Sequence, residues 1–141
     1  MSVTIRIDGF DILKRKLRAL GDVAADTLEE AVLAGAKIIQ EDASRRAPRR
    51  TGKLSRSIGI EVGDKTRDKV AVDVGPTKEA FYGKFVEMGH ALVRGRRKAE
   101  KRVIGYVPPK PFLRPAFDTN IAAVKRAVAS TLKAALRRVA R

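Results

Sequence analysis

The side chains that could carry chemistry do not form a catalytic or metal-binding pattern. The 141-residue chain has one histidine, His90, and no cysteine. Nucleophilic catalysis needs a hydroxyl or thiol beside a base that a third group orients, and Ser55 and Ser57 stand at no such spacing. A metal site would have to be built mainly from carboxylates. We therefore predict no catalytic residue, no metal and no cofactor, and we interpret His90 as a loop residue; a hydrolase using His90 is the weakest alternative.

Gly52 and Lys53 are the only residues that match the motif of a nucleotide-binding phosphate loop. That loop needs a glycine framework between a strand and a helix. The surrounding residues instead form a dense basic run that Pro48 interrupts. Nucleotide hydrolysis has little support, and an exposed basic loop is the prediction for residues 45–56.

Positive charge is the strongest signal in the composition. The chain carries 31 Lys plus Arg against 16 Asp plus Glu, a net charge of +15, which favours nucleic acid or acidic protein surfaces as partners. Residues 45–56 hold six positive side chains and no acid, and residues 94–102 hold six and only Glu100. We predict contacts to a subunit or to DNA there, with a solvated charge run as the equal alternative for the first segment. The candidate contact residues are Arg45, Arg46, Arg49, Arg50, Lys53, Arg56, Arg94, Arg96, Arg97 and Lys98.

Negative charge gathers elsewhere, in residues 22–42. This segment holds six acids and a single positive side chain, Lys37. The polarity of charge along the chain suits head-to-tail stacking of identical subunits as well as it suits DNA, because an acidic face of one copy can meet a basic face of the next.

Periodicity predicts the elements of the first half of the chain. Alternating apolar residues predict strands at residues 3–7, 58–62 and 70–74, the last two joined as an antiparallel hairpin. Helical spacing predicts a short amphipathic helix after Asp8 that ends at Gly21, and a long helix from Asp22 or Asp26 to about residue 47. Gly35 within the long helix permits either a close contact or a kink.

In the second half, the pattern predicts a short helix over residues 81–88 that Gly89 stops, with a strand as the alternative, and this aromatic-rich segment is expected to be a main part of the core. A mobile basic loop is expected at residues 91–102, and residues 103–107 are expected to add a strand to the hairpin. Prolines keep residues 108–114 extended, so that a long amphipathic helix begins only at Pro115. The predicted fold class is α+β, a small antiparallel sheet packed against a long central helix and a long C-terminal helix, in one domain spanning residues 1–141.

Glu87 is the acid with the most costly position, because it lies within an apolar cluster. Buried carboxylates need partners, and arginines are plentiful. We predict a structural ion pair between Glu87 and an arginine, with Arg114 as the candidate. No apolar run approaches the roughly 18 residues of a membrane span, so we expect a soluble protein without a secretion signal or membrane partner.

Three stretches together resemble one protein family. They are residues 47–54 (Ala-Pro-Arg-Arg-Thr-Gly-Lys-Leu), residues 82–89 (Tyr-Gly-Lys-Phe-Val-Glu-Met-Gly) and residues 111–116 (Pro-Phe-Leu-Arg-Pro-Ala), in this order after an alanine-rich helix. The ordered set resembles the small tail-component proteins of lambda-like long-tailed bacteriophages, the tail-completion, neck or head-tail joining proteins. Met88 and His90 depart from the family's usual residues at these positions.

The resemblance implies a non-enzymatic structural subunit of a phage or phage-derived particle. It implies a hexameric ring at the neck of the virion, which is assembled in the host cytoplasm. The ring would lie between the tail tube or tail terminator protein and the head-connector or head-closure protein, and it would surround the genomic DNA. The basic loops would then face the channel or adjacent rings. The structural residues beneath them would be Glu87, Gly89, Phe112, Arg114 and Pro115. The alternative function is a sequence-independent DNA-binding protein, for which the net charge and the basic terminal helix are the evidence.

Overall fold

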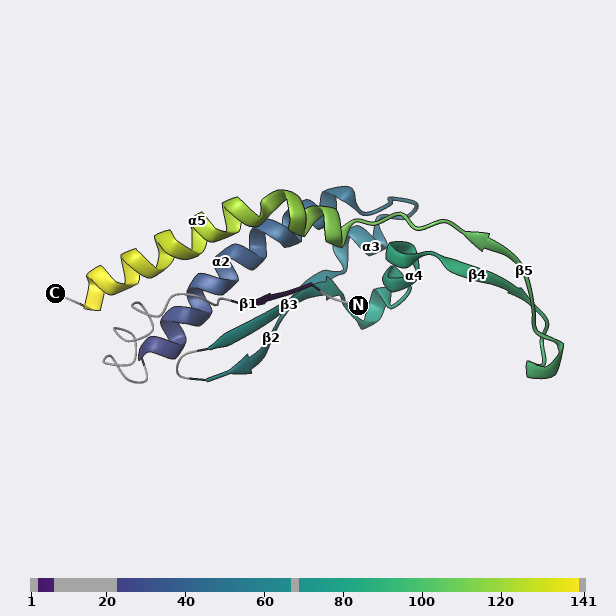
Figure 1. Cartoon of the computed structure of the whole chain (residues 1–141), viewed down its shortest axis with the longest axis horizontal. Coiled ribbons are helices and arrows are strands. Elements are labelled where there is room, and N and C mark those ends of the chain that lie inside the picture. Colours follow the sequence, from purple (N-terminus) through teal and green to yellow (C-terminus); the bar gives the residue numbers. More distant parts are fainter. Residues whose placement is uncertain (1–2, 7–22, 67–68, 140–141) are drawn as a thin grey trace.

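Two long antiparallel helices and a small antiparallel sheet form the body of the protein (Figure 1). The computed structural model describes residues 3–6, 23–66 and 69–139. Helix α2 (Val23–Arg46) packs along helix α5 (Leu113–Val139) and against the sheet. The predicted α+β fold class is confirmed. The short helix predicted between Asp8 and Gly21 lies outside the described residues.

The contact between α2 and α5 explains the glycine inside the first helix. A Cβ atom at Gly35 would lie 2.8 Å from Cγ1 of Val124 and 3.3 Å from Cγ2 of Val128. A side chain here would push the helices apart, because a carbon atom cannot approach another so closely without a shift. Of the two interpretations of Gly35, the structure supports close contact.

The sheet has the strand order β1-β3-β2 and is antiparallel throughout. It consists of β1 (Val3–Arg6), β2 (Ile58–Lys65) and β3 (Val70–Pro76). The central strand buries Val70, Val72 and Val74, and helix α2 packs against β3 and β2. The period-two pattern in the sequence therefore identified the strands and the buried face of β3.

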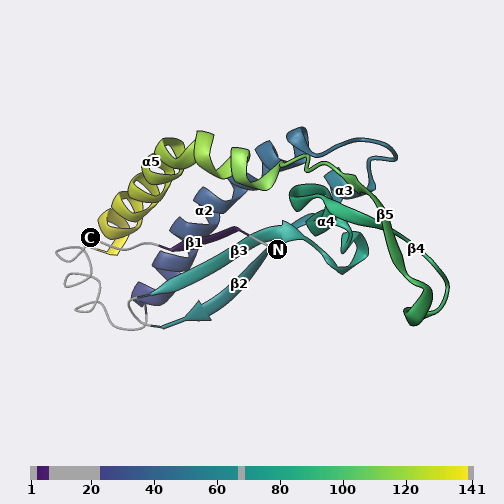
Figure 2. The same cartoon turned by 45° about the vertical axis from the view of Figure 1, so that its right-hand side comes forward.

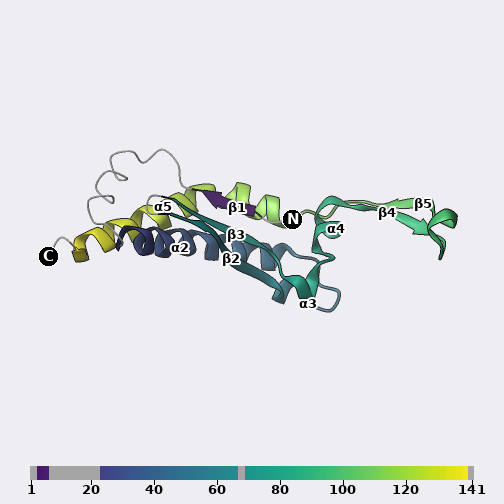
Figure 3. The same ribbon diagram turned by 90° about the horizontal axis from the view of Figure 1, so that it is seen from below.

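A second, two-stranded sheet projects from the body (Figures 2 and 3). It consists of β4 (His90–Arg94) and β5 (Arg102–Val107), with the 3-10 turn η2 (Lys98–Glu100) at its tip. We call residues 90–107 the arm. Two predictions are corrected here. Residues 91–102 are not one continuous loop, because β4, η2 and the start of β5 lie within them, and residues 103–107 pair with β4 rather than with the main hairpin.

Local sequence explains why the arm is ordered. Gly95 has a φ of 131°, and a Cβ atom there would lie 2.5 Å from the carbonyl oxygen of Glu100. Glycine thus lets the chain turn back tightly enough for Val93 to pair with Val103. The charge density of the segment concealed a strand pattern that only cross-strand pairing makes visible. The bulge between Leu92 and Val93 also breaks the simple alternation expected for residues 103–107.

The basic segment at residues 45–56 is more structured than an exposed loop. Its first two residues end α2, and its last four form the short helix α3 (Lys53–Arg56), which follows Gly52 at φ 75°. Leu54 is buried in the core, and the Ser55 hydroxyl donates a 2.7 Å hydrogen bond to the Ser44 carbonyl. An exposed loop remains only between these helices.

Helix α4 (Gly83–Met88) follows the 3-10 turn η1 (Lys78–Ala80) and ends at Gly89, as predicted. Of the apolar residues in 81–88, only Tyr82 and Val86 pack against the core, so the segment contributes less to the core than expected. Phe81, Phe85 and Met88 are 68%, 41% and 57% exposed. Helical spacing placed them together, but α4 has only six residues and turns its buried side, Gly83 and Glu87, toward the body.

Helix α5 begins at Leu113, two residues before the predicted start. Proline is tolerated at its third position because the first N–H groups of a helix have no intrahelical partner. Phe112 and Leu113 are among the largest fully buried side chains of the described residues. None of the helices in the described ranges has the length and apolar character to span a membrane.

Candidate assembly interface

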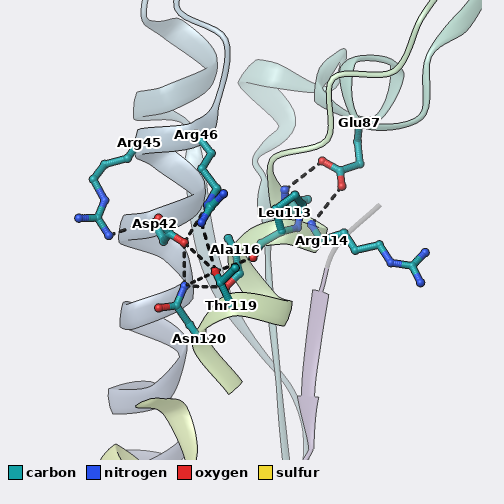
Figure 4. Close-up of polar contacts among 10 residues, drawn as sticks. Asp42, Arg45, Arg46, Glu87, Leu113, Arg114, Ala116, Thr119 and Asn120 are labelled. Carbon is teal, nitrogen blue, oxygen red and sulfur yellow. Dashed lines mark hydrogen bonds and ion pairs between the residues drawn. The ribbon is translucent and has the colours of Figure 1, made fainter. Parts of the chain in front are cut away.

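Glu87 lies at the N-terminus of α5, where its carboxylate caps the helix (Figure 4). Oε2 accepts hydrogen bonds from the backbone N–H groups of Phe112 at 2.8 Å and Leu113 at 3.0 Å, and Oε1 accepts one from Arg114 at 3.1 Å. The carboxylate is only 6% exposed. It accepts hydrogen bonds from N–H groups that have no acceptor within the helix. It also lies at the end of the helix where the helix dipole favours negative charge.

The predicted ion pair between Glu87 and the Arg114 side chain is wrong. Only the backbone N–H of Arg114 reaches the carboxylate, and its guanidinium is 84% exposed, with Nε 4.0 Å from the Asp118 carboxylate. A helix N-terminus supplies three backbone donors to the acid, so no buried guanidinium is required. The prolines in the sequence mark where α5 begins, but nothing in the sequence indicates that Glu87, 25 residues before Phe112, caps this helix.

Gly89 lets the chain pass from α4 into the arm. It has a φ of 72°, and a Cβ atom there would lie 2.7 Å from the Val107 carbonyl oxygen and 2.9 Å from the Pro109 nitrogen. The Lys110 N–H also donates to the Val86 carbonyl at 2.8 Å. Residues 82–89 and 108–116 therefore form one packed unit, the junction, from which the arm departs.

Asp42 forms a second polar cluster, which ties α2 to α5 (Figure 4). Its Oδ2 accepts hydrogen bonds from Arg46 Nε at 2.9 Å and Asn120 Nδ2 at 2.7 Å, and its Oδ1 lies 3.3 Å from Arg45 Nη2. The Thr119 hydroxyl also lies within this cluster. The sequence analysis grouped Asp42 with the other acids of residues 22–42. Its position between Ile39 and Ala43, which are both buried, could have indicated that Asp42 lies near the core.

Charge explains the protonation state of this cluster. Burial raises the pKa of Asp42, but hydrogen bonds from Arg46 and Asn120 and the charges of Arg46 and Arg45 outweigh burial and hold its pKa below the ordinary 3.8. A lowered pKa in the folded state means that the stabilisation is complete above about pH 3.8 and is lost as the pH falls through the folded-state pKa. The cluster is therefore ionised and stabilising at neutral pH.

The predicted basic contact residues fall into two separate groups (Figure 1). The first surrounds the end of α2 and α3, where Arg45 and Arg46 bind Asp42 and Arg56 lies over Gly52. The second is at the tip of the arm, beyond the junction. Arg45 and Arg46 form ion pairs with Asp42. The other predicted contact residues are exposed and form no ion pair within the part of the chain that the structure describes; they are Arg49, Arg50, Lys53, Arg56, Arg94, Arg96, Arg97 and Lys98.

Most acids of α2 are neutralised within the chain, although the sequence indicated a free acidic face. Lys65 Nζ lies 2.9 Å from Asp26 Oδ1 and 2.5 Å from Glu29 Oε2, and these hydrogen bonds, Glu29 first, raise the pKa of Lys65. Arg138 lies 3.2 Å from Glu30. Of the acids of α2, Glu41 alone has no ion-pair partner within the described ranges.

These surfaces offer electrostatic and apolar contacts. Residues 3–6, 23–66 and 69–139 contain no group of His, Cys, Asp and Glu that could hold a metal ion. His90, expected in a loop, begins β4; its Nδ1 is buried without a hydrogen-bond partner, and its ring lies edge-on to Phe85 with 5.8 Å between centroids.

Comparison with known proteins gives a family. Residues 11–89 match the family model described as "Bacteriophage HK97-gp10, putative tail-component". No curated protein and no solved structure matches the chain. The family match covers more than half of the 141 residues, including α2, the main hairpin and α4. The chain therefore belongs to the HK97-gp10-like family of bacteriophage tail components.

Proposed function

We propose that this protein is a non-enzymatic subunit of a neck or tail-completion ring, in a phage or a phage-derived particle. The ring is a homo-oligomer, taken as a hexamer, at the head-proximal end of the tail. It joins the tail tube or tail terminator protein to the head-connector or head-closure protein and surrounds the path of the DNA. Membership of a tail-component family supports a structural role in the virion.

The observation that carries this proposal is the arm. It extends away from the body in all three views, and its tip bears Arg94, Arg96, Arg97 and Lys98 without internal ion pairs among the described residues (Figures 1 to 3). A projecting, unpaired basic element is suited to contact an acidic protein surface or DNA phosphates. A protein that joins two assemblies needs such a contact.

A second candidate function is sequence-independent binding of free DNA. Two exposed arginines at the α2–α3 turn, Arg49 and Arg50, favour it, as does the net charge of +15; neither arginine has an ion pair with another described residue. Both functions predict binding that weakens with salt, because each phosphate contact releases counterions. Tight binding of duplex DNA by the monomer at physiological salt, without any association with tail or connector proteins, would favour this candidate over the first.

Reversing the charges of Arg96 and Arg97 tests the proposed role of the arm tip. We expect R96E/R97E protein to stay folded, since both side chains are exposed, and to leave heads and tails separate when it replaces the natural protein. The matched control is R126E/R137E, which reverses two exposed charges on α5. Electron microscopy scores joined particles. Normal joining by the R96E/R97E variant would show that the arm tip has no part in assembly.

A further inference from the structure

The exposed apolar surface of the protein is concentrated on one segment. Ten large apolar residues of the described chain are exposed, and eight of them lie between Phe81 and Tyr106. The other two are Val62 and Ile121. Scattered apolar residues on a surface are normal, but this many on one short segment mark a contact surface.

Within the arm, the register brings apolar side chains onto a common face. Tyr106 lies opposite Ala91, and Val103 lies opposite Val93. Tyr106, Val103 and Val93 are 77%, 60% and 51% exposed. Neither strand packs extensively on any other described element. An isolated two-stranded hairpin is at best marginally stable in water, so a surface that covers this face would stabilise the arm.

Charge defines what that surface must offer. Arg94 lies directly opposite Arg102 in the same register, and neither has an ion-pair partner in the described ranges. Like charges directly across two strands destabilise a sheet. Arg94 and Arg102 lie on the face opposite to Val93 and Val103, together with Leu92, which is 43% exposed. A surface that receives this face of the arm should therefore present carboxylates beside apolar groups.

The chain itself carries such a surface on the main sheet. A groove of about 460 Å³ runs over β2, β3 and the turn that follows, between Ile60 and Pro76, and its acids are Glu61 and Asp73. Among the described residues, no lysine or arginine lines it. Glu61 has no ion-pair partner among the described residues, and Asp73 accepts a hydrogen bond from the Thr4 hydroxyl. We call this the acidic groove.

We infer that the arm of one copy docks in the acidic groove of a second copy. The arm extends away from its own body, so it does not reach its own groove (Figures 1 and 3). The acids of α2 are a poorer receptor, because Lys65 and Arg138 already neutralise them. In addition, β2 is an edge strand with one unpaired side, which invites another strand.

An arm-to-groove contact is head-to-tail, and it repeats from copy to copy until the assembly closes as a ring. The inference rests on the proposed function, because a ring requires such a contact between subunits. It adds the two surfaces that meet and the chemistry that joins them.

Charge exchange between the two surfaces tests this inference by sedimentation velocity at low and physiological salt. We expect the natural protein to self-associate, and the variants R94E/R102E and Glu61→Lys each to shift at least tenfold toward monomer. An equimolar mixture of these two variants should associate again, since each arm then meets a groove of opposite charge. The matched control, Glu41→Lys, makes the same change at an exposed acid of α2 and should associate like the natural protein.

A natural protein that stays monomeric, Glu61→Lys protein that associates normally, or a mixture that stays monomeric would each overturn the inference. Circular dichroism and thermal melting establish that each variant is folded. The proposed function fails separately: self-association with charge rescue, but with heads and tails joined normally in the absence of the protein, would retain the contact and reject the neck role.

Discussion

Replacing Glu87 with alanine is expected to lower the free energy of unfolding by about 3 kcal/mol or more. The carboxylate accepts three backbone hydrogen bonds at the start of α5, and hydrogen bonds to a charged group each contribute about 1.5–3 kcal/mol. Its loss also leaves the N–H groups of Phe112 and Leu113 buried without an acceptor. Denaturant unfolding followed by circular dichroism measures the loss.

Three control variants separate this cap from other roles of the charge. Glu87→Gln retains one acceptor oxygen and should cost less, about 2 kcal/mol. Glu79→Ala removes an exposed acid just before α4, and Arg114→Ala removes an exposed guanidinium; each should change stability by less than about 0.5 kcal/mol. Stability unchanged in Glu87→Ala, or a loss in Arg114→Ala as large as in Glu87→Ala, would contradict the capping role.

Replacing Phe112 with alanine is expected to cost about 3–5 kcal/mol, because it removes a large core side chain and leaves a cavity. Phe112 has no exposed surface and lies in the core cluster, at the residue that enters α5. The backbone N–H of this residue, which alanine retains, donates to Glu87, so the expected loss comes from the packing of the side chain.

The matched control is Phe81→Ala, the same change at a phenylalanine that is 68% exposed. It should alter stability by less than about 0.5 kcal/mol. Thermal and denaturant unfolding of the two variants give the comparison. Equal losses of stability in the two variants would contradict the position of Phe112 in the core.

The sequence predicted most elements of the body because their patterns repeat over many residues. Helical spacing located α2 and α5, and alternation located β2 and β3, since each element buries one continuous face. The start of α5 was placed two residues late because proline rules describe the chain locally, whereas the acid that caps the helix comes from α4. The arm was predicted only in part: residues 103–107 were expected to be a strand but were given the wrong partner, and β4 was missed. Neither strand packs extensively against the body, so charged residues obscure the strand pattern of β4.

The candidate interface could be predicted only in part. The basic residues were identified by their density, and Glu87 by its position among apolar residues. Their partners could not be, because Glu87 bonds to backbone groups and Arg45 and Arg46 bind an acid three or four residues earlier on the same helix. The acidic groove was invisible because Glu61 and Asp73 lie 12 residues apart and meet only through the pairing of β2 with β3.

Electron microscopy of particles made without this protein tests the central claim most directly. If the protein completes the neck, DNA-filled heads and full-length tails should both be present but unjoined, and adding the purified protein should join them. Joined, complete particles in its absence would contradict the proposed neck function.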